Sequence, residues 1–438
     1  MKLSNIRSTF FWFLDIFKGS TISSHFKDID NIFTNYQTKA IQQKLKNRLS
    51  NLLKHASTST NFYSKYDPLT GIKSFPVINK TLVKEHLSEF RSKLFPDISN
   101  LFPMITSGST GTPFKIFHDK NKRLRNSADA IYFASKAGYS LGEKLYYFKI
   151  WSIYNKKSSL QEFMQHIIPV EALNLERTSP EILRKIQKEH SQIHFLGYVS
   201  AFETLCKVMD KHPYLIPDVK VKSIITMSES LDDYTKVSGE KYFSCPVLSR
   251  YSNIENGILA QQTLENQFDF LVNAASYLIE IFDINTDTPL TYGQTGRIVV
   301  TDYLNFATPM IRYDTGDIGA LEEKVVDGKT QLFLTNLEGR RLDQIFNTSG
   351  DLVSSYIVYK NMWKYTEIDQ YQLIQKERKE YAFKICSSVP FEREQELKNE
   401  FKEYLGIDSI FNIEYVQEIP LLASGKRKKV INMMNTAN

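Results

Sequence analysis

A ten-residue stretch, TSGSTGTPFK at 106–115, concentrates the residue types that bind phosphate. Glycines let backbone N–H groups come close to an anion, and hydroxyl side chains add further donors. The stretch lacks the GK[ST] ending of a Walker A loop, so it is not that phosphate-binding motif. Taken alone, it predicts either an ordinary turn or a loop that wraps the outer phosphates of a nucleotide.

Four further motifs follow in order along the chain, and each has an ordinary explanation by itself. Glu255 could be a surface carboxylate and Tyr251 a core aromatic. Asp317 could cap a turn, and Lys426 could be one of four solvated charges in a row. The order of all five motifs, rather than any one of them, indicates a shared site. The four motifs are YSNIENG (251–257), RYDTGD (312–317), LEGRRLD (337–343) and ASGKRKK (423–429).

Together these motifs resemble the adenylate-forming superfamily, the acyl-CoA synthetases and related acid-activating ligases. The body resembles more closely one branch of it, the phenylacetate–CoA ligase-like proteins with their capsule-biosynthesis (CapK-type) members. The stretches that carry this closer resemblance are SFPVINKTLV (74–83), AGYSLGEKLYYFKIW (137–151) and FLGYVS (195–200). The resemblance extends from about residue 40 to residue 432, which is nearly the whole chain.

The resemblance implies an α/β fold in two domains. A large N-terminal adenylation domain would cover 1–340, and a small mobile C-terminal α+β lid would cover 341–438. In this family the lid rotates between two half-reactions, and a few hinge residues absorb the change in backbone angles. By position, the pivot falls around Arg341 to Asp343.

In this family a carboxylic acid attacks the α-phosphorus of ATP and gives an acyl-adenylate and pyrophosphate. Because two anions must meet, the site has to neutralise charge and hold an in-line geometry. The resemblance implies that Lys426 bridges the substrate carboxylate and the α-phosphate, and that Glu255 ligates Mg²⁺. It implies that Asp317 accepts hydrogen bonds from both ribose hydroxyls, that Tyr251 lies against adenine, and that Arg340 reaches the ribose or a phosphate. The residues implied to hold the β- and γ-phosphates are Thr106, Ser107, Gly108, Ser109, Thr110 and Gly111.

The acid and the acceptor stay open at this point. The wall of the acid pocket is expected to draw on Tyr198, Ser228 and Arg250, a mixture that admits aromatic acids, amino acids or sugar acids. Arg250 could hold a second carboxylate, although a structural ion pair is the interpretation favoured by the sequence. The acceptor could be CoA, a carrier-protein thiol or an amine such as an amino sugar, and the capsule-cluster relatives suggest modification of a surface polysaccharide.

Departures from the family pattern motivate a second hypothesis. Thr112 stands where many relatives have lysine, and Leu342 stands at the hinge position that is often Asp or Lys. A nucleotide-binding descendant that acts as a scaffold or regulator would explain such drift. A pure binder needs no bridging lysine, so Lys426 favours the enzyme.

Composition bounds these hypotheses. At 438 residues, with 42% hydrophobic and 24% charged residues, the chain is expected to form more than one domain. A net charge of +6 over this length is too mild for a nucleic-acid-binding protein. Three widely spaced cysteines and no CxxC pair predict a reducing compartment, so a cytoplasmic location is expected.

The first twenty residues contain an apolar run from Phe10 to Phe17 that Asp15 interrupts. No small-residue cleavage site follows, so a signal peptide is not predicted, and the run is shorter than the about 20 residues of a membrane-spanning helix. An interfacial helix with Phe10, Phe13, Leu14 and Phe17 on one face would give weak membrane-surface association. Packing of that face on the protein's own body is the favoured prediction.

Apolar periodicity predicts the elements that position the motifs. Helices are expected over about 38–56, from near Asn79, and at SPEILRKIQKEH (179–190), with Ser179 as N-cap and Pro180 in the first turn. After Gly339 a module of short strands and one helix, from Pro390 to Leu405, is expected. Strands are predicted at 144–151, 193–200, 223–228, 277–284 and 296–303.

Overall fold

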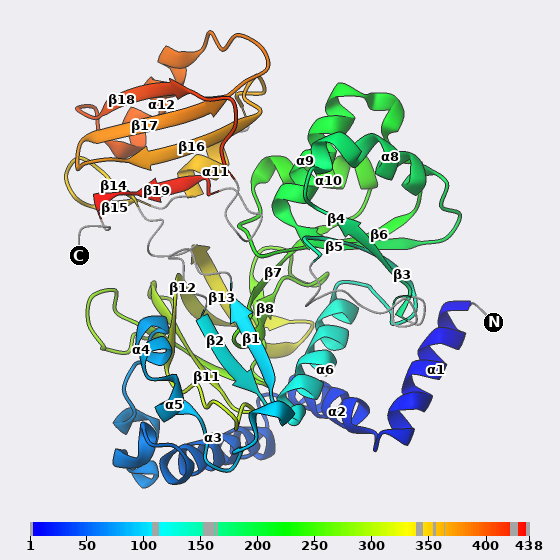
Figure 1. Cartoon of the computed structure of the whole chain (residues 1–438), viewed down its shortest axis with the longest axis vertical. Coiled ribbons are helices and arrows are strands. Elements are labelled where there is room, and N and C mark those ends of the chain that lie inside the picture. The colour runs from blue at the N-terminus through cyan, green and yellow to red at the C-terminus, as the bar shows by residue number, and fades with distance from the viewer. Residues whose placement is uncertain are drawn as a thin grey trace.

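The apolar runs of the body pair into one mixed sheet, and a smaller sheet forms at the C-terminal end. The computed structural model describes residues 3–106, 114–151, 162, 165–338, 345–353, 356–362, 364–420 and 428–434. The C-terminal module, in orange and red, lies at one end of the molecule above the larger body (Figure 1). The predicted α/β class, with a large body and a smaller C-terminal domain, is confirmed.

Within the described residues the main sheet has eleven strands in the order β10-β11-β12-β13-β9-β8-β7-β6-β5-β3-β4. The half from β7 to β4 is parallel and the half from β8 to β10 is antiparallel. The strands are β3 (Lys144–Lys149), β4 (Ile167–Glu171), β5 (Ile193–Tyr198), β6 (Val221–Met227), β7 (Val247–Asn253), β8 (Gly257–Gln261), β9 (Phe270–Val272), β10 (Tyr277–Phe282), β11 (Gly296–Asp302), β12 (Tyr313–Val326) and β13 (Lys329–Glu338). All five strands predicted from the sequence are confirmed.

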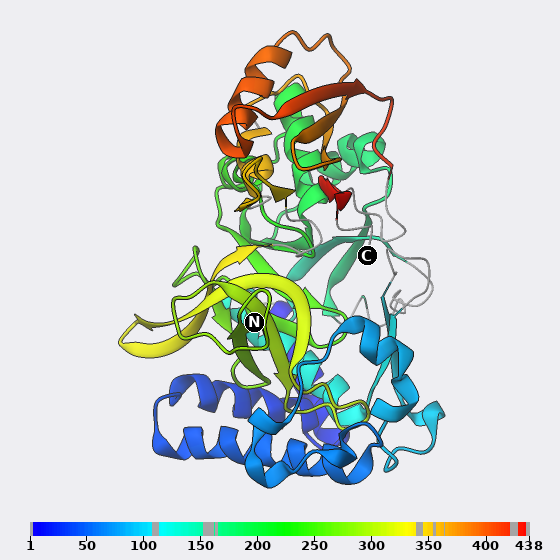
Figure 2. The same ribbon diagram turned by 90° about the vertical axis from the view of Figure 1, so that its left-hand side faces the viewer.

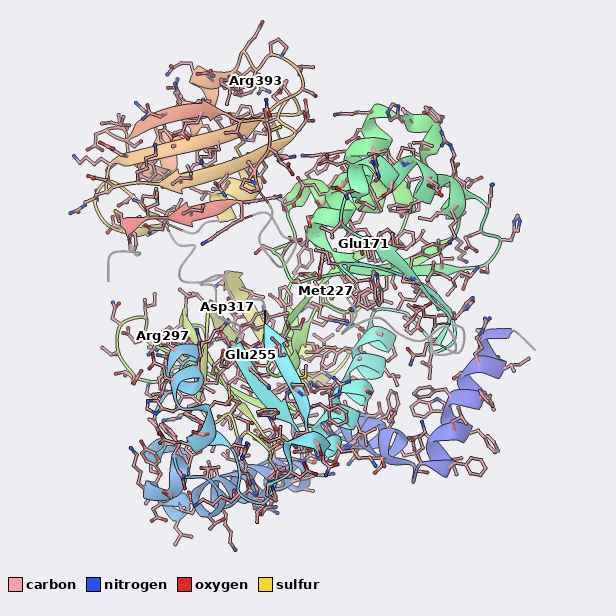
Figure 3. The ribbon with its side chains drawn as sticks, in the orientation of Figure 1. Glu171, Met227, Glu255, Arg297, Asp317 and Arg393 are labelled. Atoms are coloured by element: carbon pink, nitrogen blue, oxygen red, sulfur yellow. The ribbon has the colours of Figure 1, made fainter. Side chains whose placement is uncertain are left out.

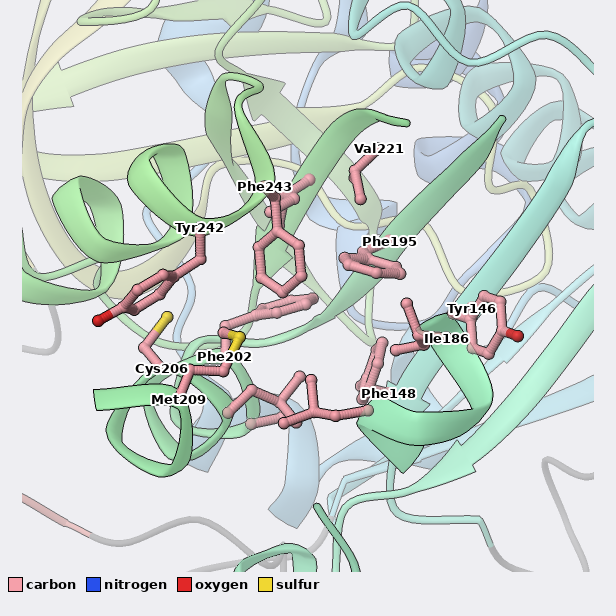
Figure 4. Packing of buried hydrophobic residues seen from close by; sticks show 14 of the residues in the cluster. Tyr146, Phe148, Ile186, Phe195, Phe202, Cys206, Met209, Val221, Tyr242 and Phe243 are labelled. Atoms are coloured by element: carbon pink, nitrogen blue, oxygen red, sulfur yellow. The ribbon is translucent and has the colours of Figure 1, made fainter. Parts of the chain in front are cut away.

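The parallel half is covered by helices and is apolar through its thickness, as buried parallel strands are. Phe148, Phe195 and Phe202 pack with Phe243 in the core between these strands and helices (Figure 4). Gly197 permits the packing, since a Cβ at this position would lie 2.6 Å from Cβ of Phe148. The helices are α8 (Leu175–Gln187), α9 (Val199–Lys211) and α10 (Asp233–Phe243), with a 3-10 turn at Pro213–Leu215.

The sequence-based start of α8 is wrong. The helix begins at Leu175, so Pro180 lies inside it, and the Ser179 hydroxyl donates to the carbonyl of Leu175 instead of capping the N-terminus. Because proline has no N–H and Pro180 lies beyond the first four residues, it removes one hydrogen bond from the second turn of the helix. Asn174, in the left-handed region, stands at the true N-terminal boundary.

The N-terminal helices lie at the end of the molecule opposite the C-terminal module (Figure 2). Thr38 caps α3 through its side chain and Asn79 caps α4, so both of these predicted helices are confirmed. The helices are α1 (Leu3–Phe17), α2 (Thr21–Thr34), α3 (Lys39–Ser59), α4 (Lys80–Glu85), α5 (Leu87–Phe90) and α6 (Lys120–Lys136). Short 3-10 turns lie at Tyr63–Lys65, Pro68–Thr70, Ile72–Ser74 and Ile98–Asn100.

The aromatic face of α1 does not pack on the body, so that prediction is wrong. Phe13 is 50% and Phe17 is 74% exposed, and Phe10 is also exposed. The contact with the body comes from another face of the helix, where the Trp12 ring meets the Phe26 ring edge-on at 5.9 Å. Within the described residues no helix is long and apolar enough to cross a membrane.

The C-terminal module is a four-stranded sheet, ordered β18-β17-β16-β19, with helices packed on it. Leu397, Phe401 and Leu405 form the buried face of its long helix, as predicted, although that helix begins at Glu394 rather than Pro390. The elements are β14 (Ile345–Phe346), β15 (Leu352–Val353), α11 (Tyr356–Met362), β16 (Gln370–Gln375), β17 (Glu380–Cys386), α12 (Glu394–Leu405), β18 (Ile410–Tyr415) and β19 (Val430–Asn432). The predicted boundary at 340/341 and the pivot at 341–343 lie outside the described residues.

Candidate functional site

The serine- and threonine-rich stretch joins the two strands of a small antiparallel hairpin. β1 (Phe102–Thr106) pairs with β2 (Phe114–His118), and Thr106 stands opposite Phe114 at the open end. The loop residues of the predicted phosphate site, Ser107, Gly108, Ser109, Thr110 and Gly111, lie outside the described residues, as does Thr112. Arg340 and Lys426 also lie outside them.

Tyr251 and Asp317 come from two distant motifs and lie in direct contact. The Tyr251 hydroxyl donates to Asp317 Oδ2 at 2.7 Å and lies 3.2 Å from Thr315 Oγ1. Burial, and secondarily Asp317, raise the pKa of the Tyr251 phenol well above its usual range. The phenol is therefore a permanent donor that fixes one carboxylate oxygen of Asp317.

Glu255 lies close by and is anchored by the hairpin and by the RYDTGD segment. The hydroxyl of Tyr313 donates to Glu255 Oε1 at 3.0 Å, and His118 Nε2 lies 2.6 Å from the Glu255 carbonyl. Burial lowers the pKa of His118 to about 4, so the ring is neutral near pH 7 and donates through Nε2. In Figure 3 Glu255 and Asp317 lie near the centre of the molecule, below the C-terminal module.

Tyr313 and His118 were missed by sequence reasoning. In an extended strand, alternate side chains face the same side, and Tyr313, Thr315 and Asp317 all contact Tyr251 or Glu255. The intervening Asp314 turns away and pairs with Arg297 at 2.8 Å. The period-two spacing in RYDTGD could have identified Tyr313, whereas the contact of His118 depends on tertiary packing and has no signal in the sequence.

The residues predicted to line the acid pocket lie at the carboxyl ends of three neighbouring parallel strands, the usual place for ligands in such sheets. Tyr198 is the last residue of β5, and Ser228 directly follows β6. Arg250 lies on β7, where it pairs with Met227, the last residue of β6. Ser228 has a φ of 73°, a left-handed conformation that costs free energy for a residue with a side chain. The structure therefore brings all three positions to one edge of the sheet.

Arg250 forms no structural ion pair with any described residue, contrary to the interpretation favoured by the sequence. Its Nε donates to Gln261 Oε1 at 2.7 Å. Gln261 stands directly across the ladder and is itself held by a 2.6 Å bond from its Nε2 to the Phe133 carbonyl.

The CapK C-terminal domain family matches residues 345–433. Protein CapK of Staphylococcus aureus is 22% identical over 386 residues, covering 85% of this chain and 82% of CapK. The chain is thus similar to CapK over most of its length, and the family match covers its C-terminal module.

Solved structures place this fold among ligases. A 2-hydroxyisobutyryl-CoA ligase in the postadenylation state, in complex with R3-HIB-AMP, is similar with a TM-score of 0.73 and 16% identity over 91% of both chains. The amide bond synthetase McbA from Marinactinospora thermotolerans has a TM-score of 0.54 and 17% identity over 74% of this chain and 67% of McbA. The same CoA ligase in the thioesterification state gives a TM-score of 0.59 over 92% of both chains. The fold of this chain therefore matches the postadenylation structure of that ligase more closely than its thioesterification structure.

A buried ion cluster joins the C-terminal module to the body. Lys429 precedes β19, and its Nζ lies 2.8 Å from Glu203 Oε2 and 3.7 Å from Asp232 Oδ2 on the body. It also lies 5.0 Å from the centre of the Tyr371 ring in its own module. Burial disfavours the ammonium, but Glu203, Tyr371 and Asp232 outweigh it and hold the pKa of Lys429 well above its usual range.

A metal ion can be accommodated at Glu255. The Glu255 side chain is only 7% exposed, and its Oε1 accepts a hydrogen bond from Tyr313. Its Oε2 accepts no hydrogen bond from any described residue. A hard cation that mainly binds phosphate oxygens needs only one or two such protein ligands. No group of three or more His, Cys, Asp or Glu that could form an all-protein metal site occurs among the described residues.

Proposed function

We propose that this chain activates a carboxylic acid with ATP as an acyl-adenylate and then transfers the acyl group to a thiol or an amine. The proposal depends chiefly on one observation. The contacts of Tyr251 with Asp317 and of Tyr313 with Glu255 bring the YSNIENG and RYDTGD motifs together. They lie beside the β1–β2 hairpin, whose strands flank the serine- and threonine-rich stretch. Fold similarity to CoA ligases and to an amide bond synthetase supports the reaction class.

Each residue has a part in the proposed reaction. The carboxylate of Asp317 would accept hydrogen bonds from the ribose hydroxyls, and Tyr251 would lie against adenine while orienting that carboxylate. Arg340 would reach the ribose or a phosphate. Lys426 would bridge the attacking carboxylate and the α-phosphate and offset the charge that builds there. The proposed phosphate contacts are Thr106, Ser107, Gly108, Ser109, Thr110 and Gly111.

Glu255 would hold Mg²⁺ through Oε2. Bound there, the ion would neutralise phosphate charge during attack. Tyr313 would keep Glu255 turned toward the phosphates by occupying Oε1.

The second half-reaction would follow rotation of the C-terminal module about the segment near 341–343. CoA, a carrier-protein thiol and an amine such as an amino sugar are the candidate acceptors. The similarity to CapK suggests that the product enters capsule or surface polysaccharide biosynthesis in the cytoplasm. Mass spectrometry of the products formed with each acceptor distinguishes a thioester from an amide.

Exchange of labelled pyrophosphate into ATP tests the adenylation step directly. We expect acid-dependent exchange with Mg²⁺ and a panel of aryl, amino and sugar acids, and a loss of at least about a hundredfold in Lys426→Ala. Lys428→Ala, in the same basic run, is the matched control and should retain exchange. Tight ATP binding without exchange for any acid would instead support the nucleotide-binding scaffold.

A further inference from the structure

Arg250 is a buried charge to which the described residues supply no counter-ion. Its side chain is 8% exposed, and among the described residues its one hydrogen bond is to a neutral amide, that of Gln261. Burial lowers the pKa of the guanidinium to about 10, with Tyr147 partly opposing the change. A buried ion without a partner costs far more free energy than one in water. The arrangement therefore calls for an anion from outside the chain.

The bond to Gln261 leaves the guanidinium in a defined orientation. Gln261 is fully buried, and its amide cannot turn because Nε2 donates to the Phe133 carbonyl. Nε of Arg250 is thereby occupied, while the two Nη groups have no hydrogen bond to the described residues. Two parallel N–H donors of this kind match the spacing of the oxygens in a carboxylate, sulfonate or phosphate.

Two acidic side chains near Tyr198, those of Glu229 and Glu171, accept hydrogen bonds from other residues. Glu229 accepts hydrogen bonds from the backbone and side chain of Ser200, and Glu171 accepts from the backbone N–H of Leu173. Both carboxylates help to raise the pKa of the Tyr198 phenol, and neither is among the groups that shift the pKa of Arg250. The groups around Arg250 itself are Tyr147 and Met227, whose hydroxyl and sulfur lie 3.9 Å apart.

Arg250 is also poorly placed to hold the carboxylate that reacts. It directly precedes Tyr251, and successive residues on a strand face opposite sides. Arg250 and Tyr251 pair with Gln261 and Ala260 in consecutive register, ahead of the register shift that follows Tyr251, so Arg250 points away from the face where Tyr251 meets Asp317. A ligand that spans both faces at the end of β7 would present a different group to each.

We propose that the acid substrate carries a second oxyanion, a carboxylate, sulfonate or phosphate, and that this distal group pairs with the Nη groups of Arg250. The inference rests on the proposed adenylation and narrows it to acids with two anionic groups. Of the acids left open by the sequence, aromatic, amino or sugar acids qualify only when they carry such a group.

Matched pairs of acids in the pyrophosphate exchange reaction test the inference. The pairs are benzoate with isophthalate, benzoate with meta-sulfobenzoate, valerate with glutarate, and gluconate with glucarate. We expect kcat/KM to favour the two-anion member of a pair at least about tenfold. Arg250→Met should lower exchange with that member about a hundredfold and abolish the preference for it over the one-anion member. Arg250→Lys, which keeps the charge but not the fork, should fall between them.

A second measurement, of thermal stability, detects binding of the acid without the adenylation reaction. Isophthalate, meta-sulfobenzoate, glutarate and glucarate should raise the thermal midpoint of the wild-type chain without ATP, and Arg250→Met should abolish the shift. The variant itself should be as stable as the wild type or more so, because it removes an uncompensated buried charge.

The outcomes separate this inference from the proposed function. Exchange with one-anion acids alone, or an unchanged preference in Arg250→Met, overturns the inference and leaves adenylation standing. Anion-dependent stabilisation that requires Arg250, without exchange for any acid, contradicts adenylation and retains the anion site. Absence of both effects overturns both.

Discussion

Two tyrosines hold the two carboxylates of the candidate site. Tyr251 donates to Asp317 and Tyr313 donates to Glu255, and burial raises the pKa of both phenols well above their usual range. Each carboxylate thus keeps one oxygen occupied by the protein. A hydrogen bond to a charged group contributes more than one between neutral groups, so each tyrosine is expected to orient its carboxylate firmly.

Tyr313→Phe is expected to raise the Mg²⁺ concentration for half-maximal adenylation about tenfold, because Glu255 loses the donor that orients it. The measurement is a Mg²⁺ titration of pyrophosphate exchange at saturating ATP. Tyr146→Phe is the matched control, since its hydroxyl also donates to a glutamate, Glu189, in another part of the body. An equal Mg²⁺ requirement in both variants would contradict the proposed orientation of Glu255.

Among single elements, α1 stands out for the apolar side that it turns outward. Ile6, Phe10, Phe13 and Phe17 recur at three- and four-residue intervals and are each about half exposed or more. A stripe of this size on a helix that rests on the body through Trp12 is unusual for a surface that meets only water. Lys18 and Lys27 are exposed nearby along the chain, which suits an anionic lipid surface.

The double substitution Phe13→Ser with Phe17→Ser is therefore expected to separate binding from stability. The free energy of unfolding should change by less than about 0.5 kcal/mol per site, because neither ring is buried. Sedimentation with phosphatidylglycerol vesicles should detect binding of the wild-type chain and its loss in the variant. A large fall in stability, or no binding by the wild-type chain, would contradict the role given to the stripe.

Helices and strands were predicted correctly where a local feature of the sequence, such as a capping residue or an apolar run, determines the element. Thr38 and Asn79 cap their helices, and the five apolar runs are strands. The start of α8 was misjudged because Ser179 can satisfy its hydroxyl within a helix as readily as it can cap one. The outward face of α1 was misjudged because periodicity shows that a face is apolar but not what covers it.

The candidate site was predictable only in part, for the same physical reason. Glu255, Asp317 and Tyr251 carry motif positions in the sequence, and they lie close together in the structure, although their roles stay predictions. His118 binds the Glu255 carbonyl from another strand, and whether Arg250 meets a carboxylate among the described residues depends on every neighbour at once. Such contacts are properties of the packed chain and leave no local trace.

For the molecule as a whole, the Lys429 cluster is a buried contact between the two modules, beside the more exposed contacts of Lys207 and Lys211 with Asp369. Lys429→Met is expected to slow pyrophosphate exchange tenfold or more, because one missing partner leaves Glu203 and Asp232 uncompensated between the modules. Acyl transfer from a preformed acyl-adenylate to the acceptor should be unchanged or faster. Lys428→Met is the control, and equal slowing of both half-reactions would contradict the assignment.

The cluster also makes the rotation of the C-terminal module dependent on pH. Burial already raises the pKa of Asp232, and Lys429 is the largest influence that opposes this. If the module turns and carries Lys429 away, Glu203 keeps Lys207 at 3.2 Å, whereas Asp232 loses the cation that opposes the effect of its burial. While Asp232 stays buried, its pKa then rises further, so the turned state binds protons more readily than the starting state. By linkage, mild acidification shifts the equilibrium toward the turned state, and each rotation draws on the proton concentration of the surroundings.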